Sequence, residues 1–260
     1  MTQIGSGRER HAVAIDGAAD AVVLSWGAAT DVGSRRRLNE DSLVAVASVF
    51  AVADGLGGHA AGDQASAAVV LRLADAATGG IVAVEEIEDA LVRAAADIAE
   101  VVDENRVGVG TTVAGAALTV QDGQPFWAVF NVGDSRVYLF EDDELGQVTV
   151  DHSVVQELVD AGLITASAAE THPDSNMITR AIGFEGADSP DFWMVPVQAG
   201  MRLLLCSDGL TKEVGHAQMQ RELARGSSPQ ETADSLVSAA LAAGGRDNVT
   251  VVVVDVVEQR

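Results

Sequence analysis

Short links between successive apolar strands constrain the fold of this chain more than any other feature of its sequence. The runs Thr111–Val120 and Pro125–Asn131 are joined by Gln121–Gln124, which has Asp-Gly at its centre. Arg136–Phe140 follows after an equally short link, Val132–Ser135. Links of this length join antiparallel neighbours, because a parallel neighbour needs a crossover of about a dozen residues or more. The sequence therefore predicts mainly antiparallel sheets.

Other segments show the periods expected of strands and helices. Val249–Val257 is so rich in valine that it fits a strand buried on both faces. A capping box, Ser228–Glu231 with proline at its second position, begins a helix that we expect to end near Gly244. The other expected strands are Val22–Trp26, Ser42–Ala47, Phe50–Ala53, Phe192–Val197 and Arg202–Cys206, and the other expected helices are Gly62–Ala77, Val84–Asp103, Val154–Ala161 and Thr165–Thr171.

The order of these elements is strands, two long helices, many strands, then a helix and a final strand. It is not the βαβ alternation of a parallel sheet, and it predicts an α+β sandwich of sheets packed face to face with helices outside. Residues 1–21 show no clear period, and we interpret them as a loose N-terminal leader. Residues 22–258 contain no linker or repeat, so we expect one domain there.

Charge and cysteine content exclude several classes of protein. The chain has 39 acidic and 16 basic residues, a net charge of −23, which disfavours binding to nucleic acid or to an anionic membrane surface. No apolar run approaches the length of about 18 residues that a membrane span requires, and charges interrupt the first 20 residues, so no signal peptide is expected. The lone cysteine, Cys206, cannot form a disulfide within the chain. We expect a cytoplasmic protein.

Four aspartates share one feature: each stands where an apolar strand begins or ends. They are Asp54, Asp134, Asp208 and Asp247. Any one of them alone is explained as a turn residue. If the strand ends converge, however, carboxylates about 4 Å apart repel by about 4 kcal/mol per pair, so a cation has to lie among them. Carboxylate and carbonyl ligands favour Mg²⁺ or Mn²⁺, and two such ions sharing a carboxylate would generate a hydroxide and hold a phosphoryl or carbonyl oxygen.

Arginines add a second chemical element in this acidic chain. Arg35, Arg36 and Arg37 stand together just before Asn39–Asp41. Either all three belong to a solvated loop, or one of them binds a phosphate through its planar guanidinium group. An arginine beside hard divalent ions is the combination used in phosphoryl transfer.

These motifs resemble those of the metal-dependent protein phosphatases, the type 2C serine/threonine phosphatases, and most closely the compact bacterial ones. The matching stretches run in family order over about residues 22–257. They are Thr30–Gly33 with Arg36 and Asn39–Ser42; Val52–His59 with Gly62, Ala65 and Ser66; Gly110–Thr112; Asn131–Arg136; Asp151–Ser153; Ile178–Gly183; Leu205–Leu210; and Asp247–Thr250.

The resemblance implies a four-layer α-β-β-α sandwich with metal ions at one edge. It implies that Asp54 bridges two Mn²⁺ or Mg²⁺ ions and that the Gly55 carbonyl completes one of them. Asp208 and Asp247 would bind the first ion, and Asp134 with Asp208 would form a weaker third site.

The same resemblance implies roles for the residues around the metals. Glu40 and Asp41 would act mostly through bound water, and Arg36 would hold the phosphate. A water bound between the two ions would attack phosphorus in line, without a phosphoenzyme, to hydrolyse phosphoserine and phosphothreonine in proteins. Residues 151–191 would contain a mobile flap beside the site. A Ser/Thr kinase that makes the substrates is a family-level expectation.

Departures from the family pattern leave some roles open. Leu56 stands where some relatives have a histidine after Asp-Gly, so the general acid is not assigned, and His59 is as readily structural. Asp63 stands where relatives more often have glutamate, and we interpret it as a helix cap at the surface; Arg180 is interpreted as structural.

Three other functions were weighed. A cysteine phosphatase would need an arginine in the loop after Cys206, and none is there. A catalytically dead phosphoprotein-binding scaffold is disfavoured because every expected ligand position holds aspartate. A related phosphatase acting on an anti-sigma-factor antagonist would share the chemistry and stays open.

Overall fold

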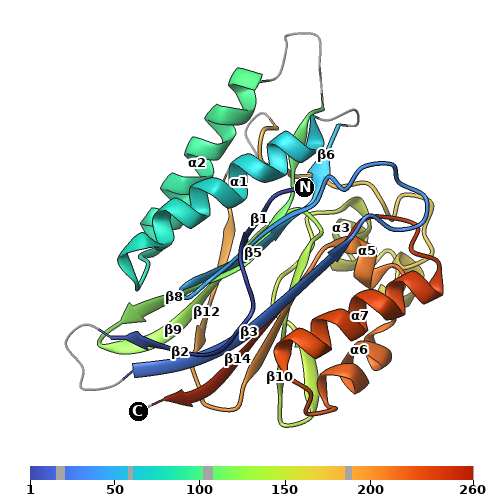
Figure 1. The fold of residues 1–260 in the computed structure, drawn as a ribbon. Coiled ribbons are helices and arrows are strands. Elements are labelled where there is room, and N and C mark those ends of the chain that lie inside the picture. Colours follow the sequence, from blue (N-terminus) through green and yellow to red (C-terminus); the bar gives the residue numbers. More distant parts are fainter. Residues whose placement is uncertain (16–20, 58–60, 102–107, 185–188, 260) are drawn as a thin grey trace.

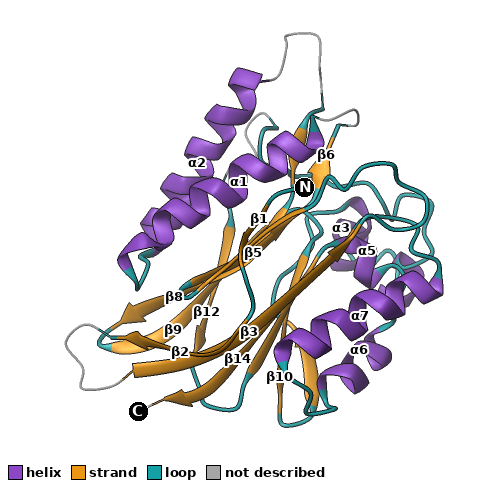
Figure 2. Ribbon diagram, in the orientation of Figure 1, coloured by secondary structure: helices purple, strands orange, loops and turns teal. Residues whose placement is uncertain are grey.

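The computed structural model describes residues 1–15, 21–57, 61–101, 108–184 and 189–259. These residues form two six-stranded sheets that pack face to face between helices, as Figures 1 and 2 show. The first sheet has the order β1 (Gln3–Gly5), β4 (Ser42–Val46), β5 (Val49–Ala53), β8 (Val113–Gln121), β9 (Gln124–Val132) and β12 (Asp191–Pro196). The second has the order β11 (Glu144–Gln147), β10 (Arg136–Glu141), β13 (Arg202–Cys206), β14 (Val249–Gln259), β3 (Ala21–Asp31) and β2 (Arg8–Ala14). A two-stranded ribbon joins β6 (Gly55–Leu56) to β7 (Gly110–Thr111).

Helices form the two outer layers. On one side lie α1 (Gly62–Ala76) and α2 (Val84–Val101), with the short 3₁₀ turn η1 (Ala77–Gly79) between them. On the other side lie α6 (His216–Leu223) and α7 (Pro229–Ala243). The expected capping box is present at the start of α7, where the Ser228 hydroxyl and the Glu231 carboxylate bond reciprocally to backbone amides. The shorter helices are α3 (Val154–Asp160), α4 (Ala166–Ala169) and α5 (Asp208–Thr211).

Three apolar layers hold the sandwich together. Along β14, Val252, Val254 and Val256 enter the layer between the sheets, whereas Val251 and Val253 pack under α6 and α7. The third layer lies between the first sheet and α1 and α2. The prediction that this final strand is buried on both faces is therefore confirmed.

Strand pairing also follows the sequence-based prediction. All described pairs in the two large sheets are antiparallel except β1 with β4, which is parallel. Asp122 and Gly123 both have positive φ, 52° and 76°, as a tight hairpin between β8 and β9 requires. The predicted α+β sandwich of two mainly antiparallel sheets flanked by helices is confirmed.

The expected loose leader is wrong for residues 3–14. β1 pairs with β4 and β2 pairs with β3, so this segment supplies an edge strand to each sheet. Edge strands bury few side chains, and β2 is mostly exposed and carries Arg8, Glu9 and Arg10, which hides its period in the sequence. Residues 16–20 of the expected leader lie outside the described residues, as do the last two residues of the predicted helix Val84–Asp103.

Other short elements were not predicted. Among them, β11 is a short edge strand with one buried residue, and α6 is an eight-residue helix with few apolar residues. Of the helices in the described part of the chain, none combines the length and hydrophobicity that crossing a bilayer requires.

Candidate metal and phosphate site

Strand register brings the predicted aspartates to one edge of the sandwich. Ser42 pairs with Ala53, so Asp41 and Asp54 flank a paired position in the first sheet. Arg136 pairs with Cys206 in the second sheet, and Asp134 and Asp208 lie just beyond those two residues. Asp247 precedes β14, whose first residue pairs with Asp31 at the end of β3. Figure 1 shows the end of β3 and the start of α5 close together at this edge.

The charges of these carboxylates act on one another. Burial raises the pKa of Asp54 well above its ordinary value, and the charges of Asp41, Asp208, Asp134 and Asp247 raise it further. The four aspartates predicted from their positions at strand ends therefore come together, and Asp41 lies in the same cluster. We call the set Glu40, Asp41, Asp54, Asp134, Asp208 and Asp247 the acidic edge.

Glycines permit the close approach of the segments that carry these side chains. A Cβ on Gly55 would lie 2.1 Å from the Gly62 carbonyl oxygen and 2.7 Å from that of Glu40. A Cβ on Gly209 would lie 1.9 Å from the Asn248 carbonyl oxygen. Any larger residue would push the acidic edge apart at these positions, which explains the Asp-Gly pairs at 54–55 and 208–209.

Hydrogen bonds fix Glu40 and Asp41 beside the strand ends. Asp41 is fully buried, and its Oδ2 accepts from the Thr250 hydroxyl at 2.6 Å and from the Ser207 hydroxyl at 2.9 Å. The Glu40 amide donates to Asn248 Oδ1 at 2.9 Å. The sequence analysis missed Ser207, Asn248 and Thr250 as positioning residues, although they lie inside motifs that it singled out.

Two other carboxyl groups of the acidic edge are held partly protonated. Burial, opposed by the hydroxyl bonds from Thr250 and Ser207, raises the pKa of Asp41 to about 7. Burial and the charge of Asp208 raise the pKa of Asp134 to about 7. Loss of water on burial is thus the main reason that these two carboxyl groups resist ionisation, and neighbouring carboxylates add to it.

Two cationic side chains already touch the acidic edge. Arg36 Nη2 donates to Asp247 Oδ2 at 2.7 Å, and the side chain is 52% exposed, so its fork remains open to solvent. Arg36 also interacts electrostatically with Asp54 and Glu40, which supports its choice over Arg35 and Arg37. The ammonium of Lys212 pairs with Asp208. Lys212 was not predicted as a site residue. The sequence feature that could have indicated it is its spacing of four residues from Asp208, which begins α5.

Carboxylate oxygens without partners show how the site fits a divalent ion. Asp208 Oδ1, Asp41 Oδ1 and Glu40 Oε1 are buried and have no hydrogen-bond partner among the described residues, and the same holds for Asp63 Oδ1. Hard oxygen donors suit Mg²⁺ and Mn²⁺. Asp63 therefore has an oxygen shielded from solvent and is more than the surface helix cap expected. Within the described ranges, no three His, Cys, Asp or Glu side chains are already grouped to hold a metal; Arg36 and Lys212 each hold a carboxylate instead.

A second polar network acts electrostatically on Asp134 of the acidic edge. Arg136 donates to both carboxylate oxygens of Asp151 at 2.7–3.1 Å and to the Tyr138 hydroxyl at 3.0 Å. Gln147 also donates to Asp151 Oδ1, at 3.0 Å. We call these four residues the Arg136 network.

The segment expected to form the flap is tied to the loop that carries Asp134. His152 Nδ1 accepts from the Gly133 amide at 3.1 Å, and its Nε2 lies 3.2 Å from Asp191 Oδ2 and 3.0 Å from Arg180 Nη1. Arg180 also pairs with Asp191 at 2.9 Å. Residues 185–188 of this segment lie outside the described residues.

The structure contradicts a nucleophilic role for Cys206. The thiol is buried in β13, and burial raises its pKa to about 12. A thiol of this kind is protonated at neutral pH and inert. Leu56 lies in the ribbon β6, whereas His59, the other position weighed for a proton donor, lies outside the described residues.

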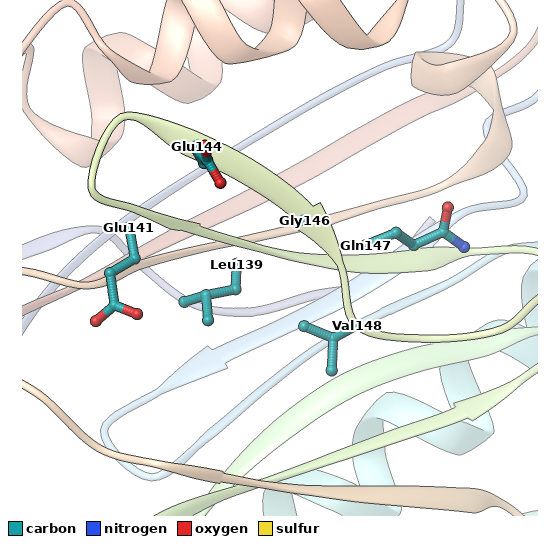
Figure 3. A pocket seen from close by; sticks show the side chains of 6 residues that line it. All are labelled: Leu139, Glu141, Glu144, Gly146, Gln147 and Val148. Carbon is teal, nitrogen blue, oxygen red and sulfur yellow. The ribbon is translucent and has the colours of Figure 1, made fainter.

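A separate hollow lies on the β10–β11 hairpin (Figure 3). It is lined by Leu139, Glu141, Glu144, Gly146, Gln147 and Val148. Its two glutamates and the absence of a cation from its lining make it unsuited to a phosphate group. We therefore assign the chemistry to the acidic edge.

Comparisons with known proteins give the same class. Residues 34–243 match the protein phosphatase 2C family. The chain is 39% identical over 239 residues to the serine/threonine phosphatase stp of Listeria innocua, covering 87% of this chain and 93% of that relative. It is 42% identical over 245 residues to the serine/threonine protein phosphatase PstP of Mycobacterium tuberculosis, covering 91% of this chain and 46% of that longer protein.

Solved structures agree in fold. A crystal structure of PstP from Mycobacterium tuberculosis matches with a TM-score of 0.82 and 38% identity, over 90% of this chain and 99% of that chain. A structure of the PstP catalytic domain in complex with two manganese ions matches with a TM-score of 0.79 and 37% identity, over the same shares of the two chains. The sandwich thus has the architecture of a metal-dependent protein phosphatase. Within that class, the chain belongs to the protein phosphatase 2C family.

Proposed function

We propose that this chain hydrolyses phosphoserine and phosphothreonine in proteins, with Mn²⁺ or Mg²⁺ held at the acidic edge. The observation that carries the proposal is the clustering of Asp54 with four other aspartates, two of which, Asp41 and Asp208, have a buried oxygen without a partner among the described residues. The names of the relatives and the two manganese ions in the PstP catalytic domain support the same chemistry.

The proposal assigns a ligand role to each strand-end residue. Asp54 would bridge two ions, the Gly55 carbonyl would complete the coordination of one, and Asp208 and Asp247 would hold the first ion. Its support is that Asp54, Asp208 and Asp247 interact electrostatically and that Asp208 Oδ1 has no partner among the described residues. Ions bound there would act as Lewis acids toward a phosphoryl group and lower the pKa of water to near neutrality.

The protein's own side chains would position the substrate and the solvent. Arg36 would exchange its bond to Asp247 for the phosphate, because its guanidinium is half exposed and already beside the carboxylates. Glu40 and Asp41 would orient water through Glu40 Oε1 and Asp41 Oδ1, while Thr250 and Ser207 fix the Asp41 carboxylate.

The proposal extends to partners and location. Substrates would be proteins phosphorylated by a Ser/Thr kinase, and because such kinases use ATP, the protein would act in the cytoplasm. The net charge of −23 supports a protein that does not bind nucleic acid.

A phosphopeptide panel tests the proposed function. Phosphoserine, phosphothreonine and phosphotyrosine peptides would be assayed with Mn²⁺, with EDTA and with a thiol-blocking reagent. We expect release of phosphate from the first two, abolished by EDTA, restored by Mn²⁺ or Mg²⁺ and unaffected by the thiol reagent. Binding of phosphopeptides without turnover would favour a scaffold and would overturn the proposal.

A further inference from the structure

We propose that the side chain of Lys212 fills the place of a third cation between Asp134 and Asp208, so that the chain binds two divalent ions rather than three. The inference rests on the proposed function and replaces the third metal site expected from the family resemblance. It makes Lys212 a positioning residue for the two carboxylates that such a site would use.

The contact between Lys212 and Asp208 is built into one helical turn. The Lys212 ammonium pairs with Asp208 Oδ2, and the Lys212 amide donates to the Asp208 carbonyl at 2.9 Å. The Asp208 side chain is only 12% exposed and that of Lys212 is 34% exposed. The lysine side chain is thus partly buried, and its ammonium is held by a carboxylate of the acidic edge.

Lys212 acts on the second carboxylate as well. Its positive charge lowers the pKa of Asp134, opposing the effects of burial and of Asp208. Lys212 also interacts electrostatically with Asp54. Its ammonium therefore pairs with one of the two carboxylates that a shared divalent ion would use and acts electrostatically on the other.

The choice of residue supports this role. Lys212 is the only lysine in the chain, and the other 15 basic residues are arginines. An ammonium is a compact point charge with three donors, whereas a guanidinium is a planar fork. The only lysine thus stands beside Asp208 and acts on Asp134, the two carboxylates expected to share a third ion.

Charge at the acidic edge is balanced by two ions. When all six of its carboxylates are ionised, Arg36 and Lys212 leave four negative charges, which two divalent ions neutralise. A third divalent ion would leave an excess of positive charge. Asp151 does not enter this balance, because Arg136 neutralises it.

Asp208 can serve both cations at once. Its Oδ2 is used by Lys212, whereas its Oδ1 is buried and without a partner among the described residues. One oxygen is therefore free for a divalent ion while the other keeps the ammonium.

Metal stoichiometry tests the inference independently of catalysis. Equilibrium dialysis and calorimetric titration with Mn²⁺ should give two ions per wild-type chain and three per Lys212→Met chain, since methionine has similar length and no charge. Arg72→Met removes one positive charge from the exposed Arg72–Asp97 pair between α1 and α2, and this control should still bind two. Three ions in the wild type, or two in Lys212→Met, would overturn the inference.

The single lysine allows a second measurement on the unaltered protein. With ¹⁵N label placed only in the lysine side chain, the ammonium gives one signal, from Lys212. We expect that signal to stay protected from exchange when Mg²⁺ is saturating, and a signal that becomes solvent-exposed would show displacement by an ion. Failure to bind any divalent ion would instead contradict the proposed function, so the two failures are distinguishable.

Discussion

Two polar clusters lie side by side in this molecule, and they differ in how completely they are satisfied. In the Arg136 network, Arg136 donates to both oxygens of Asp151 and to Tyr138, and Gln147 adds a further bond to Asp151. In the acidic edge, three buried carboxylate oxygens have no partner in the part of the chain that the structure describes, and neighbouring carboxylates repel one another. A satisfied buried network stabilises a fold, whereas an unsatisfied one of a single sign has to be completed by a ligand.

Ionisation follows the same division. In the Arg136 network, burial lowers the pKa of the Arg136 guanidinium, but its interactions with Asp151 and Tyr138 together raise it, so Arg136 keeps its charge. In the acidic edge, burial and mutual repulsion raise the pKa of Asp41 and Asp134 to about 7. The first cluster is complete as folded, and in the proposed function divalent ions would complete the second.

Replacement of Asp54 should give the largest loss of activity, and it should distinguish the acidic edge from the Arg136 network because stability should not fall. Asp54→Asn removes the proposed bridging charge, so we expect activity to fall by more than about 100-fold, the upper range for residues that only support a metal ligand. The metal-free protein should become more stable, because one repelling charge is gone. Phosphopeptide turnover and thermal unfolding in EDTA measure the two effects. Activity near that of the wild type would refute the two-ion assignment.

The sequence could predict the acidic edge because its residues stand at strand ends. Asp54, Asp134, Asp208 and Asp247 each follow or precede a strongly apolar run, and antiparallel register brings such ends together. The layers were predictable for the same reason, since Val-rich β14 has to be covered on both sides.

Other features depend on tertiary contacts that leave no local pattern. β1 and β2 are edge strands that bury little, so their residues resemble a leader. The buried oxygen of Asp63 becomes visible only when the strand ends and α1 are placed in space.

Replacement of Asp151 should have the opposite consequence to that of Asp54. Asp151→Asn leaves the Arg136 charge without its partner in a largely buried position, which destabilises by about 3 kcal/mol. Urea unfolding of the metal-free protein should show the loss, and Arg72→Met provides a control for charge removal at the surface. Equal stability of Asp151→Asn and the wild type would mean that the Arg136 network does not stabilise the fold.

Replacement of Arg36 should affect substrate binding more than folding. The guanidinium is half exposed and bonds to Asp247, so Arg36→Ala should raise KM for a phosphopeptide by about tenfold, the loss of one charge-assisted bond. Arg37→Ala removes the same charge from the adjacent position and should leave KM nearly unchanged. If Arg37→Ala and not Arg36→Ala raised KM, the phosphate contact would belong to the neighbouring residue.

The smallest expected effect is a pH dependence that the acidic edge has and the Arg136 network lacks. Asp41 and Asp134 have an ordinary pKa of 3.8 and a folded-state pKa of about 7, so between about pH 4 and pH 7 the folded protein holds protons that the unfolded chain has released. Stability of the metal-free protein contributed by these groups is therefore present at low pH and lost as pH rises through that window. Divalent ions bind the deprotonated carboxylates, so the stabilisation of the protein by these ions grows over the same window.

Thermal unfolding with EDTA and with Mg²⁺ should give midpoints whose difference widens from pH 5 to about pH 7.5. The Asp134→Asn variant should show a smaller widening than the wild type, and a constant difference in the wild type would contradict the assignment of these protons to the acidic edge.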